Sequence, residues 1–172
     1  MIFFQLCRKR LFYRRQNTAE IKKRITLADD QQFIRNELKR LDLVSFVADG
    51  SILPRETGVS DRPMKGSVAF HSPDSLRITL NLPGHGPISG MAIHRGITLI
   101  VGGGYHGKST LLKALESGVY NHIPGDGREY VITDETAVKL RAEDGRSVNH
   151  VDISLFIRDL PNKKDTTCFS TA

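Results

Sequence analysis

The alternation of apolar and polar residues along the first part of the chain predicts a helix followed by a strand. Residues 26–41 are expected to form a helix, because their apolar side chains recur at helical spacing on one face. Asp29, followed by Gln32 three residues later, has the arrangement of a capping box at the start of this helix. The apolar run 43–47 predicts a short buried strand, and the Gly- and Pro-containing stretch 58–66 predicts a loop.

An antiparallel hairpin is predicted in the middle of the chain. Residues 76–82 alternate between apolar and polar side chains, and residues 88–94 supply a second strand after a Pro- and Gly-rich turn. The unbroken apolar run 97–101 has the composition of a parallel strand buried on both faces. Apolar residues at helical spacing then predict a helix over 110–116, closed by Gly118. The weaker pattern beyond it predicts strands at 128–133 and 137–142, a turn at 143–146, and a strand or short helix at 151–157.

A glycine-rich motif lies between the predicted strand and the predicted helix. Residues 102–109 fit G-x-x-x-x-G-K-[ST], the phosphate-binding loop called Walker A. Its glycines allow positive φ angles, and its amides and the positive end of the following helix attract phosphate. Lys108 is expected to reach the β- and γ-phosphates, and the Ser109 hydroxyl to ligate Mg²⁺. The residues expected to bind a nucleoside triphosphate are Gly102, Gly103, Gly104, Tyr105, His106, Gly107, Lys108, Ser109 and Thr110.

Length and composition are those of one ordinary soluble domain. The 172 residues are 39% hydrophobic and 26% charged, and no apolar stretch approaches the ~20 residues of a membrane span. Cys7 and Cys168 lie at opposite ends of the sequence, so neither a disulfide framework nor a zinc site is predicted. The chain is therefore expected in the cytoplasm, with no membrane partner.

Much of the excess positive charge lies in the first 24 residues, which hold no acidic residue before Glu20. This segment is interpreted either as a solvated helix or as a contact for nucleic acid. An organellar transit peptide is a less favoured alternative. We divide the chain into a basic helical segment at 1–27, a helix–strand–loop lead-in at 28–66, and a partial nucleotide-binding domain at 67–172.

Four runs of residues, at 46–55, 102–110, 118–129 and 141–148, have a pattern found in a known family. Over roughly residues 28–172 the chain resembles the predicted ATPases of the ABC class, which are ATP-binding-cassette proteins distinct from the transporters. The resemblance implies an α/β fold of the P-loop NTPase type. The expected architecture is a truncated ABC-type ATPase core, with an antiparallel β hairpin before the P-loop strand and an N-terminal helical segment.

The resemblance also implies a function. It implies binding and hydrolysis of ATP with Mg²⁺, at sites shared by a head-to-tail homodimer or with a second cassette half. Members continue with a signature segment and a Walker B strand that carries the water-activating Glu; residues 168–172 match only the lead-in to that segment. No Gln follows Gln32 to serve as a Q-loop residue. The chain is therefore interpreted as a fragment that binds ATP and lacks the general base for turnover by itself.

Other candidate residues have weaker patterns. The six histidines, at positions 71, 85, 94, 106, 122 and 150, show no metal-ligand spacing. His106 is interpreted either as a phosphate contact or as a solvent-facing loop residue. The family resemblance implies an aromatic residue on adenine, for which Phe70 or Tyr105 is available, although Phe70 is also expected in the core. Glu143 and Asp144 are predicted turn residues, with the hypothesis that they hold Mg²⁺ through water.

Two other functional classes stay open. A nucleotide-regulated RNA-binding module without turnover would use the basic residues 1–24, and some relatives in the resembled family are suspected of acting on RNA. A small-molecule kinase would take its acid from Asp134 or Asp152. The hairpin ahead of the phosphate loop argues against the kinase.

Overall fold

The computed structural model of the chain describes residues 17–103, 105–140, 147, 149–155 and 165–170. The chain consists of two compact units, residues 1–138 and residues 139–172, and each is described by itself. The division predicted at residues 27 and 66 stays a prediction.

The first element is a long helix, α2 (Thr18–Arg40), of 23 residues. It begins at Asn17, whose side chain accepts hydrogen bonds from Ala19 N at 3.1 Å and Glu20 N at 3.4 Å. The predicted helix start near Asp29 is therefore wrong, because Asp29 lies in the middle of α2. The apolar spacing detected only the part of the helix that is buried, since the first two turns face solvent. Residues 1–16 lie outside the described residues.

Four antiparallel strands form one sheet. They are β1 (Leu43–Ala48), β2 (Arg77–Leu82), β3 (Gly86–His94) and β4 (Val131–Thr133), in the spatial order β2-β3-β1-β4. A short 3₁₀ helix, η2 (Asp74–Leu76), precedes β2. The predicted strands at 43–47, 76–82 and 88–94 are confirmed, and β2 and β3 form the predicted hairpin. β1 is a central strand, paired with β3 on one edge and with β4 on the other.

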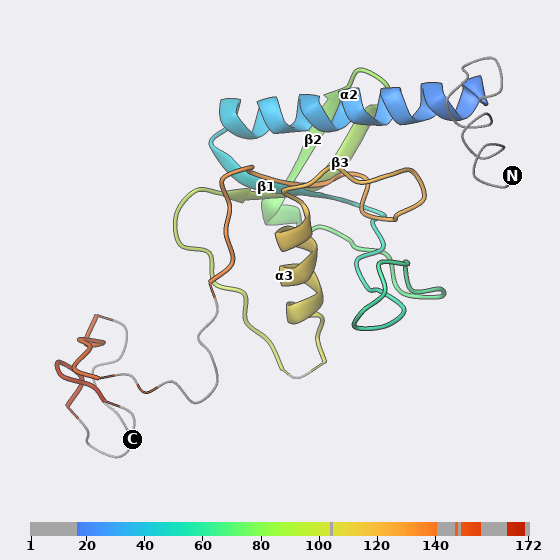
Figure 1. Cartoon of the computed structure of the whole chain (residues 1–172). Coiled ribbons are helices and arrows are strands. Elements are labelled where there is room, and N and C mark those ends of the chain that lie inside the picture. The colour runs from blue at the N-terminus through green and yellow to red at the C-terminus, as the bar shows by residue number, and fades with distance from the viewer. Residues whose placement is uncertain (1–16, 104, 141–146, 148, 156–164, 171–172) are drawn as a thin grey trace, which may run out of the picture. The chain divides into compact units, whose positions relative to one another are not determined.

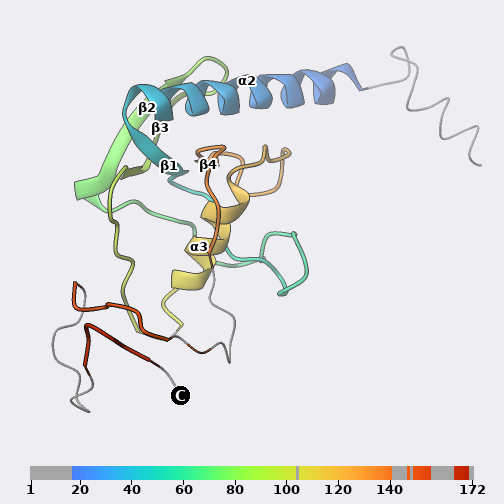
Figure 2. The ribbon, with the colours of Figure 1, turned by 60° about the vertical axis from the view of Figure 1, so that its left-hand side comes forward.

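The sheet is covered on both faces, by α2 on one and by a second helix, α3 (Lys108–Ser117), on the other (Figures 1 and 2). Successive strand residues point to opposite faces, which divides the core into two clusters. On the α2 side the central members are Ile34, Leu38, Phe46, Ala92 and Ile132. On the α3 side they are Val47, Leu53, Met91, Ala114 and Val131.

The apolar run 97–101 does not form the strand predicted for it. Ile97 is 97% exposed, Leu99 81% and Val101 73%. The preceding strand, β3, is paired on both edges by β2 and β1, and the two edge strands, β2 and β4, do not pair with this segment either. A parallel strand needs neighbouring strands to which it is hydrogen-bonded, and none of the described strands is hydrogen-bonded to residues 97–101.

Of the remaining predicted elements, one helix is confirmed, one strand is shorter than predicted, and one strand does not occur among the described residues. The helix expected at 110–116 is α3, which begins two residues earlier and is closed by Gly118, as predicted. Of the strand expected at 128–133 only the last three residues form β4, because Val131 N is bonded to Arg128 O in a turn. No strand occurs at 137–140, where Ala137 N is bonded to Asp134 O, and residues 141–142 lie outside the described residues.

The described part of the second unit consists of short irregular segments. Val151 and Phe169 form an isolated antiparallel bridge, with N–O distances of 3.1 and 2.9 Å. Nearby, His150 Nδ1 lies 3.0 Å from Cys168 Sγ. Val151 therefore takes part in a single bridge, while part of the predicted element at 151–157 and the whole predicted turn at 143–146 lie outside the described residues.

Candidate functional site

The glycine-rich loop has the backbone conformation of an anion-binding concavity. Gly102 has a φ of 151°, Tyr105 of 61° and Gly107 of 79°, while His106 between the last two does not have a positive φ. Successive residues of opposite hand turn their N–H groups toward one point, the arrangement called a nest. The loop shape therefore favours a negatively charged group. Gly104 lies outside the described residues.

The loop leads directly into the N-terminus of α3. Gly107 occupies the N-cap position in the left-handed conformation, and its carbonyl accepts a hydrogen bond from Leu111 N at 2.9 Å. The first turn of α3 carries Lys108, Ser109 and Thr110, and none of its residues is acidic. The free N–H groups and the positive end of the helix dipole thus add to the potential of the nest.

The Lys108 ammonium crosses the loop. Its Nζ donates a hydrogen bond to Gly102 O at 2.6 Å and another to Gly103 O. The positive charge is therefore held beside the backbone of residues 102 and 103. Ser109 is exposed beside it, and Thr110 is half-buried.

A pocket of about 400 Å³ extends from the loop over the α3 side of the sheet. Its lining includes His106, Lys108, Thr110, Leu53, Val68 and Phe70. Phe70 also packs against the core cluster on this face, as expected, and its place on adenine stays a prediction. Tyr105 is fully exposed and is not among the described residues that line the pocket, whereas Phe70 is. The imidazole of His106 lies beside Gly103, where an added Cβ would stand 3.0 Å from its Cε1.

The two acidic candidates for a kinase, Asp134 and Asp152, each make local hydrogen bonds. Asp134 Oδ1 accepts hydrogen bonds from Thr136 N and Oγ1, at 2.9 and 2.7 Å, and Oδ2 lies 3.3 Å from Arg95 Nη2. These contacts, the Thr136 hydroxyl first, hold the pKa of the Asp134 carboxyl below its ordinary value. Asp134 is thus a turn residue, as its sequence context predicts. Asp152 lies in the second unit, where its Oδ1 accepts a hydrogen bond from Ser154 N at 2.9 Å.

Glu143 and Asp144 lie outside the described residues, so their predicted link to Mg²⁺ stays a hypothesis. Among the described residues, no three His, Cys, Asp or Glu side chains gather as metal ligands do.

Two of the runs that carried the family resemblance meet in space. Arg55, from the run 46–55, forms an ion pair with Asp126, from the run 118–129, with 2.9 Å between Nη2 and Oδ1. His122 Nδ1 lies 2.6 Å from the other oxygen of Asp126. Burial would raise the pKa of the Asp126 carboxyl, but the contacts with His122 and Arg55 outweigh burial and lower it. Sequence reasoning missed this cluster, because nothing local pairs residues 71 positions apart.

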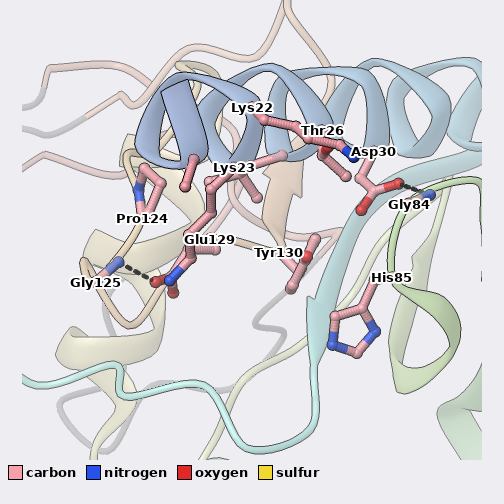
Figure 3. Close-up of a pocket in the computed structure, with 12 residues that line it drawn as sticks. Lys22, Lys23, Thr26, Asp30, Gly84, His85, Pro124, Gly125, Glu129 and Tyr130 are labelled. Carbon is pink, nitrogen blue, oxygen red and sulfur yellow. Dashed lines mark hydrogen bonds between the residues drawn. The ribbon is translucent and has the colours of Figure 1, made fainter. Parts of the chain in front are cut away.

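A different pocket, of about 570 Å³, lies between α2 and the loop that precedes β4 (Figure 3). Asp30, which is 1% exposed, accepts a hydrogen bond from Gly84 N at 2.7 Å. His85 and Tyr130 form the opposite wall, with their rings edge to face and 5.3 Å between centroids. Burial, followed by the charges of Asp30 and Glu129, raises the pKa of the Tyr130 hydroxyl to about 12. This pocket shares no lining residue with the pocket beside the phosphate loop.

The nest, its lysine and the helix behind it define a protein of the P-loop class. The chain belongs to the ABC_ATPase family, whose P-loop domain model matches residues 17–172. It is also 33% identical, over 140 residues, to an uncharacterized protein of Methanocaldococcus jannaschii. That match covers 77% of this chain and 31% of the relative, so the chain spans less than a third of the relative's length. Within the described part of the chain, no helix is both long enough and apolar enough to cross a bilayer.

Proposed function

We propose that this chain binds ATP with Mg²⁺ at the phosphate loop, and that the longer protein to which such a chain belongs hydrolyses it. The observation that carries the proposal is the backbone of the loop. The left-handed conformations at Tyr105 and Gly107 form a concave row of amides that ends at the N-terminus of α3, with the Lys108 ammonium across it. A triphosphate is the ligand that such a loop and lysine suit.

The pocket beside the loop favours a nucleotide over a bare polyphosphate. The loop and Lys108 form its polar end, while Leu53, Val68 and Phe70 supply apolar surface at the other. A nucleotide matches both ends of this pocket, because the faces of its planar base are apolar and its phosphates are charged. Phe70 is the residue that we assign to the base.

Mg²⁺ fits the residues at this position. The Ser109 hydroxyl is exposed in the first turn of α3, next to Lys108, and an oxygen ligand of this kind suits a hard cation that also keeps several water molecules. Bound Mg²⁺ would neutralise phosphate charge at that place. Lys108 and the loop amides would orient the phosphates and stabilise the negative charge that develops on them.

Hydrolysis needs a group that activates water, and among the described residues that line the pocket beside the loop none is acidic. We therefore assign binding to this chain, and turnover to the longer protein in a head-to-tail pair of cassettes. The second cassette comes either from another copy or from another part of the same longer protein. A measurement of molecular mass in solution with ATP distinguishes a dimer from a monomer.

The test measures ATP binding and phosphate release on the same sample of the full chain with Mg²⁺. Lys108→Ala is expected to lower the affinity for ATP about a hundredfold, because it removes charge-assisted hydrogen bonds to phosphate. Its free energy of unfolding should change by less than about 0.5 kcal/mol, since the hydrogen bonds that Lys108 donates go to carbonyls of exposed loop residues. Lys22→Ala, on the exposed part of α2, is the matched control. Undiminished ATP affinity in Lys108→Ala would contradict the proposal.

A nucleotide-regulated RNA-binding module is a second candidate. Lys22 and Lys23 are exposed on the first turns of α2, which gives the basic segment a rigid surface for phosphates. RNA retention that falls with salt and disappears in Lys22→Ala/Lys23→Ala would favour this function. Unchanged retention in that variant would exclude these lysines as the RNA contact.

A further inference from the structure

The cluster formed by the two meeting runs holds a buried guanidinium that forms no ion pair with a carboxylate of the described residues. Arg128 is 5% exposed, yet none of the ion pairs among the described residues includes it. Its Nε and Nη2 donate to Leu53 O, the first at 3.0 Å, and its Nη1 donates to Ser117 Oγ at 3.0 Å. These three hydrogen bonds go to neutral acceptors. Two of the five N–H donors of the guanidinium then have no hydrogen bond to a described residue.

A buried cation without a counter-charge is unfavourable, and the surroundings of Arg128 add to the cost. Burial lowers the pKa of Arg128, and so does the nearby positive charge of Arg55. Asp126 and Asp61 act in the opposite direction from a distance, but Asp126 is bound to Arg55 and His122. The guanidinium of Arg128 would therefore gain from an anion placed against it.

There is space for such an anion. A pocket of about 370 Å³ lies along α3, and its lining includes Arg55, Arg128 and Lys113 together with Thr110 and Ser117. Asp61, which is exposed, is the one acidic residue in this lining. Cations and hydroxyls together are the groups that hold a phosphate.

The pocket under α2 differs in charge. Its lining has two lysines, Lys22 and Lys23, and two acidic residues, Asp30 and Glu129, so this pocket favours neither anions nor cations (Figure 3). The cationic excess belongs to the pocket along α3.

We propose that the pocket along α3 is a second anion site, which binds a phosphate group, free or as the monoester end of a small molecule. It lies next to the nucleotide pocket, because Pro54 and Thr110 line both. A ligand there would stand beside the triphosphate, as a phosphorylated co-substrate or effector does. This inference does not rest on ATP binding at the phosphate loop.

The experiment measures binding of radiolabelled inorganic phosphate to the full chain by equilibrium dialysis. Lys108→Ala serves as the background, so that the cation of the phosphate loop does not contribute. In this background Lys113→Gln should raise the dissociation constant for phosphate about tenfold, because it removes one charge-assisted contact. Lys22→Gln removes the same charge elsewhere and should leave the constant unchanged. Arg128→Gln should abolish binding, with circular dichroism as the check on folding.

The outcomes separate the proposals. Loss of all phosphate binding in Lys108→Ala, or equal constants for Lys113→Gln and Lys22→Gln, would overturn the second site. If Arg128→Gln does not fold, the comparison of Lys113→Gln with Lys22→Gln decides alone. Displacement of the label by glycerol phosphate as well as by phosphate supports a monoester ligand, and displacement by phosphate alone supports the free anion. Failure of the ATP site would show instead as unchanged ATP affinity in Lys108→Ala.

Discussion

Gly90 of β3 lies against the ring of Phe46 so closely that a Cβ added to Gly90 would stand 2.6 Å from Phe46 Cζ and 2.5 Å from Val47 O. Gly90→Ala should therefore lower the free energy of unfolding by about 3 kcal/mol, because the backbone of the paired strand cannot move aside. Gly58→Ala is the control, since nothing lies within 4 Å of its added Cβ. Urea unfolding measures both, and equal stabilities would contradict the packing described.

The phosphate loop makes a second prediction, at Gly107. Its φ of 79° is costly for alanine, although an added Cβ would meet nothing within 4 Å. Gly107→Ala should destabilise the protein by about 1–2 kcal/mol, and Gly107→Asn by less, because Asn tolerates the left-handed region. Thermal unfolding of the two variants compares them. An alanine variant as stable as the asparagine variant would mean that this backbone conformation is not required.

The Arg55–Asp126 pair predicts acid sensitivity. The pKa of Asp126 is lowered in the folded chain, so the stabilisation is present above the ordinary value of 3.8 and is lost as the pH falls through the folded pKa. Arg55→Ala should cost about 3 kcal/mol at neutral pH, because it leaves a half-buried carboxylate with His122 alone. In Arg55→Ala the free energy of unfolding should also decrease less steeply as the pH falls. Urea unfolding at several pH values measures this, and an unchanged slope would contradict it.

The raised pKa of Tyr130 predicts that the free energy of unfolding falls as the pH rises at the alkaline end. Its pKa of about 12 exceeds the unfolded value of 10.0, so the folded chain holds its proton longer and loses stability between these two pH values. Titration of phenolate absorbance should show one tyrosine that ionises late, and Tyr130→Phe should remove it. Tyr120→Phe, at an exposed residue, should leave it in place. A late tyrosine that survives in Tyr130→Phe would assign the shift to another residue.

Sequence patterns predicted the parts of the fold that depend on local spacing. The hairpin of β2 and β3 was predictable because alternation and a Pro–Gly turn fix it locally. The start of α2 was not, since its exposed turns have no apolar stripe and Asp29 resembles a cap. The run 97–101 was assigned to a strand by composition, yet strand formation also needs a partner strand, and none of the described strands pairs with this run.

The candidate site shows the same division. The loop from Gly102 to Ser109 was predictable, because one contiguous motif specifies its shape and charge. The contacts of Arg128 were not, since its acceptor Leu53 lies 75 positions away and no local pattern relates the two. A pocket built from two distant runs becomes visible only once the chain is folded.

The place of β1 in the sheet affects how the chain is synthesised. The first strand to leave the ribosome is a central one, and its partners β3 and β4 end at residues 94 and 133. At ordinary rates of translation, roughly ten seconds separate the appearance of β1 from that of β4. Until β4 has appeared, one edge of β1 lacks its partner strand, and the core clusters that β1 shares with β4 stay incomplete. Pausing of the ribosome before β4 would lengthen this interval, whereas pausing after it would not.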